Sequence, residues 1–334
     1  MTDGICTLAN DYVYDQVVAL LNSIEAVSGA DMPVCIFPYD NRIVRLQQLA
    51  AERPQVQVYD DQAAIQRWDK TVCKIWATHP TAKQEWPTVS DQGIHRMGTH
   101  RRYCAFDGPF DRFVYMDADT LLISPLDPVF AALETMDWVT YDFQFKDLSH
   151  VFREHQSSNQ LPIFSDNQLH EQIFCSGFYG SKRGIFQADA LDDILSALSQ
   201  GEAEILYPMA PDQTILNYMV LKRKLPSINL ALTLPPEQRT GNSVTSQHFE
   251  TRDGLVYDKG RRLIYLHYIG VSSKLFQRLC EGENVDIPYR DVFLHYRYLR
   301  SPAARPQYKG PLISTQPKPP NLRQRLLKKL SLLN

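Results

Sequence analysis

Short apolar runs alternate with helically spaced apolar residues along residues 5–59, and this alternation restricts the fold more than any other feature of the sequence. Repeated strand–helix alternation predicts an α/β protein with a doubly wound, mostly parallel, Rossmann-like sheet. Such sheets bind ligands at the carboxyl ends of their strands, where the strand order reverses. Residues 7–12, which end the first expected strand, are therefore a candidate site. The pattern predicts strands over residues 5–9, 32–37 and 56–59, with helices over residues 17–24 and 43–51.

The clearest strand signal lies at residues 113–116, which follow the turn-like Asp107-Gly108-Pro109. This strand ends in Asp117-Ala118-Asp119-Thr120, and the apolar residues 121–123 are expected to continue it. The polar segment 144–174 has weak periodicity, which favours a long excursion from the sheet. The remaining pattern predicts strands over residues 138–141, 174–180 and 263–269, and helices over residues 190–198 and 211–221.

Asp117 and Asp119 are two acids separated by one residue at the end of a buried strand. Alternate side chains of a strand point to the same face, so both carboxylates could bind one hard cation. A Mg²⁺ or Mn²⁺ bound in this way keeps open positions for the oxygens of a diphosphate. An Asp-x-Asp triplet occurs by chance in many chains, so the prediction depends on the surrounding sequence, VYMDADTLLISPLDPVF.

This strand and its Asp-x-Asp-Thr motif resemble the signature of GT-A glycosyltransferases. The similarity is greatest to glycosyltransferase family 8, which includes glycogenin and bacterial lipopolysaccharide galactosyl- and glucosyltransferases. Four further segments match in the family's order: ICTLANDYVYDQVVALLNSI, FCSGFYG, PDQTILNYMV and LHYIGVSSK. The resemblance implies a GT-A fold and metal-dependent transfer of a sugar, with retention, from a nucleoside diphosphate donor such as a UDP-sugar. The acceptor, whether a glycan, a lipid-linked molecule or a protein, is not defined by it.

The resemblance also implies roles for individual residues. His267 would complete the metal site with Asp117 and Asp119, because a neutral imidazole is a good ligand for divalent cations. Lys274 would place positive charge on the leaving diphosphate, although three residues separate it from Gly270 where the family has two. The other implied donor contacts are Thr7, Asn10, Asp11 and Tyr12 around the base, together with Ala118 and Gly270.

Asp212 and Gln213 open an expected helix after Pro211. An acid at this position can cap the helix by accepting free backbone N–H groups. The resemblance implies instead that both residues face the donor sugar, with Gln213 near the anomeric carbon. Because this position lacks a strong nucleophile, front-face departure and attack is the mechanism that the resemblance implies. Thr214 and Ser176 depart from the family, which has an acid and an asparagine there.

Three other positions have two interpretations each. The family places a donor-binding arginine before the metal strand; Arg101 is the candidate that we name, although the sequence does not show whether Arg101 or Arg102 points inward. Asp40 could bind the ribose hydroxyls or cap the next helix. Asp142 could touch the donor sugar or only end a strand.

The charge distribution argues against a nucleic-acid partner. Residues 1–300 contain 28 of the 35 Lys/Arg residues and all 38 Asp/Glu residues, a formal charge of −10, whereas nucleic-acid binders present a basic face. The six scattered cysteines have no CxxC spacing, which favours buried free thiols in a reducing compartment. The N-terminus lacks a signal-peptide pattern, and no apolar run approaches the ~20 residues of a membrane span. We therefore expect a cytoplasmic protein.

The expected organisation is a GT-A domain over residues 1–300, a proline-rich linker over residues 301–320 and a basic amphipathic helix over residues 321–334. Leucines at helical spacing with bases between them are typical of helices on anionic membrane surfaces. The helix could equally dock on its own domain or fray. Contact through this helix would make the chain a peripheral membrane protein rather than a membrane-spanning one.

Two other functions compete with glycosyl transfer. A sugar-phosphate nucleotidyltransferase uses a related fold, but it needs a glycine-rich basic loop after the first strand, and TLANDYVYD has neither glycines nor bases. An inactive GT-A-like protein could serve as a membrane-surface binding module. The presence of Asp117, Asp119 and His267 argues against lost catalysis.

Overall fold

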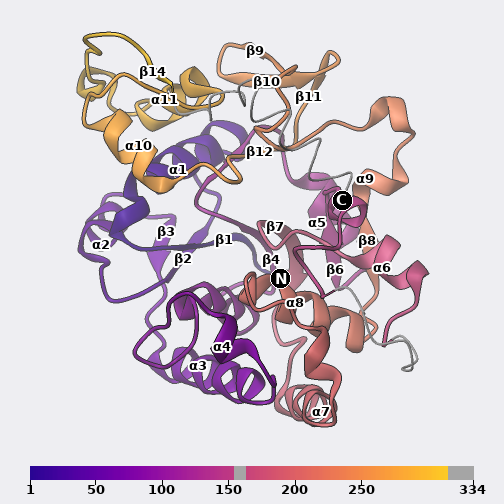
Figure 1. The fold of residues 1–334 in the computed structure, drawn as a ribbon. Helices are drawn as coiled ribbons and strands as arrows, with labels where there is room; N and C mark the ends of the chain where they lie inside the picture. The colour runs from indigo at the N-terminus through magenta and orange to yellow at the C-terminus, as the bar shows by residue number, and fades with distance from the viewer. Residues whose placement is uncertain (154–162, 315–334) are drawn as a thin grey trace, which may run out of the picture.

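A seven-stranded sheet runs through the centre of the molecule (Figure 1). The structure is a computed structural model and describes residues 1–153 and 163–314. In spatial order the strands are β3 (Val56–Val58), β2 (Val34–Pro38), β1 (Asp3–Ala9), β4 (Arg112–Met116), β7 (Phe178–Lys182), β6 (Trp138–Thr140) and β8 (Ser227–Asn229). The first four strands are parallel, β7 is antiparallel to both of its neighbours, and β8 is parallel to β6. The predicted doubly wound, mostly parallel sheet is confirmed.

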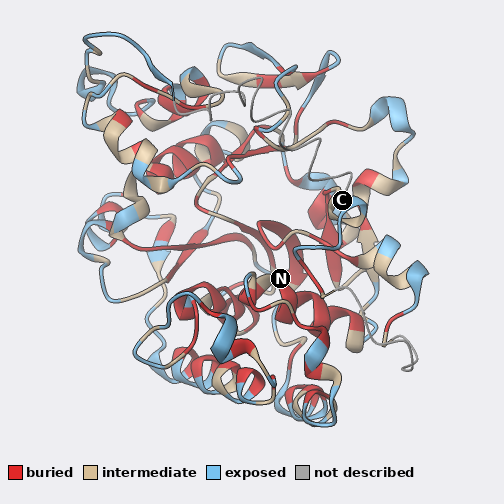
Figure 2. Cartoon of the chain, in the orientation of Figure 1, coloured by how far each residue is buried: buried red, intermediate tan, exposed pale blue. Residues whose placement is uncertain are grey.

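Helices cover both faces of this sheet because successive residues of β1 face opposite sides. Cys6 and Leu8 pack in one buried cluster with Trp68 of α3 (Gln62–Ala77). Ile5 packs in a second cluster with Val17 of α1 (Tyr14–Ser28), on the other face. The two helices lie on opposite sides of the central strands (Figure 1), and buried residues fill both layers (Figure 2). Both faces of β1 are thus covered, which explains its continuous apolar sequence.

The strand order reverses beside β1. The chain builds β1, β2 and β3 toward one edge of the sheet and then returns to place β4 on the other side of β1. Cys6 pairs with Tyr115, so the carboxyl ends of β1 and β4 lie next to each other. This is the position where open α/β sheets bind ligands. The loops after Ala9 and Met116 therefore define the place to look for a site.

A smaller C-terminal layer packs against α1. Its third buried cluster joins Ala19 of α1 to Phe276 and Phe293, and the Asn22 side chain donates a hydrogen bond of 2.6 Å to the Tyr296 carbonyl. Within this layer β5 (Thr120–Leu122) pairs antiparallel with β12 (Tyr265–His267). The other elements of the layer are β9 (Glu250–Arg252), β10 (Leu255–Asp258), β11 (Arg261–Arg262), α10 (Ser273–Cys280), β13 (Val285–Asp286) and α11 (Arg290–Arg297). The β5–β12 pair joins this layer to the end of β4.

Most of the expected helices and strands are present with shifted ends. The other helices are α2 (Val44–Ala51), α4 (Ala82–Glu85), α5 (Asp127–Ala132), α6 (Asp166–Gln172), α7 (Ala188–Ser199), α8 (Pro211–Lys222), α9 (Leu230–Thr233) and the 3₁₀ turns η1 (Asp11–Val13), η2 (Met97–Asp107), η3 (Gln144–Lys146), η4 (Glu202–Ile205), η5 (Pro236–Gln238) and η6 (Pro302–Ala304). The strand expected over residues 174–180 begins only at Phe178. The excursion over residues 144–174 includes η3 and α6, and part of it lies outside the described residues.

One expectation about the metal strand was wrong. Residues 117–119 form a turn, and β5 leaves the main sheet to pair with β12, so residues 121–123 do not continue β4. Thr120 closes this turn, because its backbone N–H and its hydroxyl donate to the Asp117 carbonyl at 3.0 and 2.7 Å. The two acids are therefore presented by a tight turn rather than by one face of a strand.

The C-terminal segment is described as far as residue 314. There β14 (Ile313–Ser314) pairs in parallel with β13, so this part of the predicted linker returns to the body of the protein. The helix predicted over residues 321–334 lies outside the described residues. Among the helices that the structure describes, none has the length and apolar character needed to cross a membrane.

Candidate active site

Asp117, Asp119 and His267 come together at the end of β4. One ligand atom from each of the three side chains lies within 4.8 Å of the others, and His267 Nε2 is 3.3 Å from Asp119 Oδ1. The antiparallel pairing of His267 with Thr120 brings the histidine to the turn. Two carboxylates and an imidazole form a donor set suited to a divalent cation, with positions left for other ligands. The geometry thus fits the metal site that the resemblance implied.

Gly177 leaves the space that His267 occupies. A Cβ atom at residue 177 would lie 2.6 Å from His267 Cε1 and 3.1 Å from Asp117 Oδ2. The Gly177 carbonyl also accepts a hydrogen bond of 2.9 Å from the Asp117 backbone N–H. The segment FCSGFYG predicted a strand, but nothing in it distinguishes Gly177. The space that Gly177 leaves is needed because His267, which is distant in sequence, packs against it.

The three metal-site side chains affect one another's ionisation. Burial raises the pKa of Asp117, and the Arg102 charge beside it offsets part of that rise. Burial also acts to raise the pKa of Asp119, but the nearby His267 imidazolium lowers it overall. The pKa of His267 is raised well above its usual value: burial opposes this shift, and Asp119 outweighs burial. The carboxylate of Asp119 and the imidazole of His267 thus stabilise each other's charged forms.

Arg102, rather than Arg101, points into the site. Its Nη2 lies 3.1 Å from Asp117 Oδ1 and 3.1 Å from Asp212 Oδ2, and its Nη1 donates to the Ser176 carbonyl at 2.8 Å. The side chain is almost fully buried. Arg101 forms an ion pair with Asp69 at 3.0 Å, so Arg101 was the wrong choice of the two. The two neighbouring arginines of η2 point to different partners, which the sequence did not reveal.

Asp212 and Gln213 lie in the first turn of α8, after Pro211. The Asp212 carboxylate forms an ion pair with Arg102, and the N-cap residue of α8 is Ala210, which makes no side-chain cap. Burial acts to raise the pKa of Asp212, but the Arg102 charge and neighbouring bases lower it overall. Gln213 accepts from the Ser176 backbone N–H at 3.1 Å and donates to the His150 carbonyl at 3.0 Å. The Gln213 side chain is thus held by the loop that also carries Gly177, and the Asp212 side chain by Arg102.

An open cavity of about 440 Å³ lies beside the metal turn. Asn10, Tyr12 and Ala118 line it, as the implied donor contacts require. Its volume is in the usual range for a small-molecule site. The other lining residues come from the ends of β1 and β4, from η2 and from the start of α10: Leu8, Ala9, Val13, Gln16, Tyr39, Arg42, Arg96, Thr99, Arg102, Asp117, Asp119 and Ser273.

Two residues expected around the base do not reach this cavity. Thr7 is fully buried within β1. The Asp11 carboxylate accepts backbone N–H groups of Arg45 and Leu46, each at 3.1 Å, and so stabilises the first turn of α2. The Thr7 side chain is thus enclosed by the sheet and the Asp11 side chain is bonded to α2, and the contact of either residue with a nucleotide stays a prediction.

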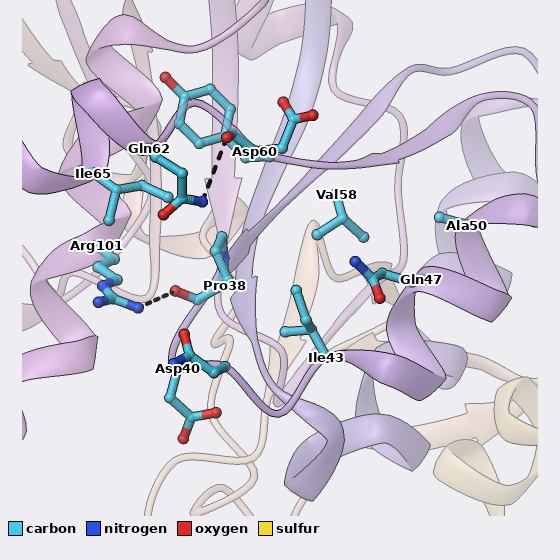
Figure 3. Close-up of a pocket in the computed structure, with 12 residues that line it drawn as sticks. Pro38, Asp40, Ile43, Gln47, Ala50, Val58, Asp60, Gln62, Ile65 and Arg101 are labelled. Atoms are coloured by element: carbon cyan, nitrogen blue, oxygen red, sulfur yellow. Dashed lines mark hydrogen bonds between the residues drawn. The ribbon is translucent and has the colours of Figure 1, made fainter.

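Asp40 and Arg101 line a separate cavity of about 360 Å³ at the ends of β2 and β3 (Figure 3). There the Arg101 guanidinium donates to the Pro38 carbonyl. Asp40 accepts from Asn10 Nδ2 at 2.9 Å and from the Arg42 backbone at 2.9 Å. The carboxylate thus orients Asn10 from outside the central cavity, in place of the direct ribose contact that we considered.

Gly270 and Lys274 are both exposed, beyond the end of β12. Gly270 has a φ of 78°, a left-handed conformation that favours glycine in the turn before α10. Ser273 lines the cavity, whereas Lys274, one residue later, does not. The structure therefore gives no support to the predicted contact of Lys274 with a diphosphate.

Asp142 is buried just after β6. Its carboxylate accepts backbone N–H groups of Gln144 at 2.8 Å and Cys175 at 3.1 Å. Burial raises its pKa from 3.8 to about 7. The residue anchors the start of the 175–177 loop, so its structural role is clear.

The fold is similar to that of solved glycosyltransferases. The galactosyltransferase LgtC in complex with donor and acceptor sugar analogs has 14% identity and a TM-score of 0.50, over 80% of this chain and 87% of that one. An active-site mutant of LgtC gives 13% identity and a TM-score of 0.51, over 81% and 88%. The bifunctional glycosyltransferase WbbM in its apo form gives 14% identity and 0.51, over 91% of this chain and 52% of WbbM. No protein-family model matches the chain, and the search of curated proteins gives no match.

These likenesses confirm the predicted GT-A fold. The cavity lies beside the reversal of strand order, where open α/β sheets bind ligands.

Proposed function

We propose that this protein is a metal-dependent glycosyltransferase that uses a nucleoside diphosphate sugar. The observation that carries the proposal is the Asp117–Asp119–His267 cluster at one wall of an open cavity, at the ligand-binding end of a GT-A sheet. The solved LgtC structure of this fold is described as a complex with donor and acceptor sugar analogs. A metal-dependent transferase that uses a nucleoside diphosphate sugar needs such a cation to stabilise the leaving diphosphate.

Asp117, Asp119 and His267 would hold the cation, Mn²⁺ or Mg²⁺. When bound, it would neutralise negative charge that develops on the diphosphate oxygens. Asn10 and Tyr12 would contact the nucleoside, because they line the cavity at the end of β1. Asp40 keeps the Asn10 amide oriented by accepting from its Nδ2 atom. Uridine is the base that we propose, following the family resemblance.

Asp212 and Gln213 would bind the sugar end of the donor. The buried Arg102 holds the Asp212 carboxylate ionised and fixed, so it can accept hydroxyl hydrogen bonds of a sugar. Gln213 is neutral and is not a strong nucleophile. This supports a retaining, front-face reaction in which the donor bond breaks as the acceptor hydroxyl approaches from the same side. The acceptor that we propose is a glycan, free or carried by a lipid or protein.

We also propose that the protein works in the cytoplasm, with residues 321–334 in contact with anionic membranes. The basis is the sequence of the tail, with four bases among its helically spaced leucines. Such contact would suit a lipid-linked acceptor.

The direct test is calorimetric titration of the full chain with UDP- and GDP-sugars, with and without Mn²⁺. We expect binding of at least one donor that depends on the cation, and slow hydrolysis of that donor. If no nucleotide sugar binds under any metal condition, the proposal fails. A Mg²⁺ arm identifies the preferred ion.

A further inference from the structure

Arg96 has an unusual backbone conformation at the edge of the cavity. Its φ of 48° and ψ of 41° place it in the left-handed region, directly before η2. For a residue other than glycine this conformation is disfavoured and persists only where the surroundings fix it. Here Thr99 fixes it, because its backbone N–H and hydroxyl both donate to the Arg96 carbonyl, at 2.9 and 2.8 Å.

The Arg96 side chain faces the candidate active site. Arg96 lines the central cavity together with Tyr39, Thr99 and Arg102. On its other side it lines a neighbouring hollow beside residues 88–92. Arg96 therefore lies at the shared wall of the two hollows. Burial raises the pKa of Tyr39, and the charge of Arg96 acts to lower the pKa values of both Tyr39 and Asp212.

Of the three arginines that line this cavity, only Arg96 forms no ion pair among the described residues, although its charge helps to lower the pKa of Asp212. Arg102 pairs with Asp117 and Asp212, and Arg42 pairs with Asp40. Within residues 1–153 and 163–314, Arg96 has no carboxylate within ion-pair distance of its guanidinium. A cation at the metal site would balance the charges of Asp117 and Asp119, so it would leave the charge of Arg96 available to a ligand.

We infer that Arg96 binds the diphosphate of the nucleotide donor. This inference rests on the proposed function and adds a residue that the sequence resemblance did not suggest. The diphosphate of a nucleotide sugar brings two negative charges to the cavity, and a guanidinium pairs with phosphate oxygens through two parallel hydrogen bonds. Lys274, which the resemblance assigned to this task, does not line the cavity. We therefore expect Arg96, in place of Lys274, to stabilise the negative charge of the diphosphate.

The test compares the binding of UDP, GDP and uridine to the Mn²⁺-loaded full chain. The variants are Arg96→Gln, Arg96→Lys and Lys274→Gln. Arg261→Gln is the matched control, because this exposed arginine lies on β11, outside the cavity. We expect Arg96→Gln to weaken UDP binding about tenfold or more, the usual effect of losing a charged hydrogen bond. Uridine binding should not change. Arg96→Lys should lose less, and Lys274→Gln and Arg261→Gln should bind UDP within about twofold of the unaltered chain.

A further variant separates binding from folding. Arg96→Gly removes the guanidinium but suits the left-handed backbone, so its Tm should equal or exceed that of the unaltered protein while UDP affinity falls. The inference is overturned if Arg96→Gln and Arg96→Gly bind UDP like the unaltered chain, or if uridine binding falls equally. It is also overturned if Lys274→Gln alone loses affinity. Failure of the unaltered chain to bind UDP or GDP is a different result, since it contradicts the proposed function itself.

Discussion

The Nη2 atom of Arg102 lies 3.1 Å from Oδ2 of Asp212, although the two residues belong to elements far apart in the sequence. The same atom is 3.1 Å from Oδ1 of Asp117, one of the candidate metal ligands. One buried guanidinium therefore connects the turn after β4 with the start of α8. Its position links the predicted cation site to the predicted sugar site.

Replacing Arg102 should destabilise the protein and weaken metal binding together. Arg102→Gln leaves two carboxylates without their counter-charge, and breaking a buried ion pair in this way typically costs about 3–5 kcal/mol. Arg102→Lys keeps the charge but loses some contacts, so it should have a smaller effect. Urea unfolding and Mn²⁺ titration measure the two quantities. Arg101→Gln is the control: it breaks the Asp69 pair outside the central cavity, so it should change stability without changing Mn²⁺ affinity.

Asp119→Asn should remove cation-dependent donor binding. The substitution keeps the shape of the side chain but removes one anionic ligand, so we expect Mn²⁺ affinity to fall by at least about tenfold. Titration of Mn²⁺ and then of UDP measures this change. Asp192→Asn, at an exposed position of α7, is the matched control. Unchanged Mn²⁺ affinity in Asp119→Asn would remove this carboxylate from the metal site.

Gly177→Ala should displace His267. The added Cβ would lie 2.6 Å from His267 Cε1, closer than atoms approach without movement, so the imidazole must shift from its position beside Asp119. We expect a loss of Mn²⁺ affinity of about tenfold or more. Gly180→Ala, in the following strand β7, would crowd Val129 Cγ1 of α5 at 2.8 Å, away from the site. It should lower stability and leave Mn²⁺ affinity unchanged; equal effects of the two variants on Mn²⁺ binding would contradict the assignment.

Asp142 should make the protein less stable as the pH rises from about 4 to about 7. Burial raises its pKa from 3.8 to about 7, so in this range the folded protein retains a proton that the unfolded chain releases. The penalty is absent below the unfolded pKa and complete above the folded pKa, and it amounts to at most about 4 kcal/mol. Urea unfolding from pH 4 to pH 8 measures it. Asp142→Asn should remove this part of the pH dependence, and Asp192→Asn should not; parallel curves for all three proteins would refute the assignment.

Deleting residues 321–334 should release the protein from anionic vesicles without loss of donor hydrolysis. The segment supplies four bases and four helically spaced leucines, which together favour an anionic surface. Co-sedimentation with phosphatidylserine vesicles measures binding, and neutral vesicles are the control. Equal sedimentation of the full and shortened chains would place any membrane contact elsewhere.

Much of the fold could be predicted because local sequence patterns reflect burial. The apolar runs that became β1, β2 and β4 are covered on both faces, and the apolar spacing in α1 matches the side that faces the sheet. The 16-residue helix α3 was not predicted. The buried apolar residues of α3, which include Trp68, Val72 and Trp76, recur at helical spacing with charged residues between them. This periodicity was a signal from which the helix could have been predicted.

The candidate site could be predicted only in part. Asp117 and Asp119 are close in sequence, so their motif is visible without a structure. Thr7 and Asp11 lie in an equally recognisable segment, yet one is inside the sheet and the other stabilises α2. A motif identifies a segment, but the direction of each side chain depends on what packs around it.

The sequence by itself determined the strand–helix alternation, the Asp-x-Asp motif and the resemblance to GT-A enzymes, because these depend on neighbouring residues. Only the tertiary structure decided that Arg102 rather than Arg101 enters the site, that Gly177 makes room for His267, and that Arg96 has a charge without a partner among the described residues. These relationships join β4, β12, η2 and α8, and distances between such segments are set by packing, which no local pattern records.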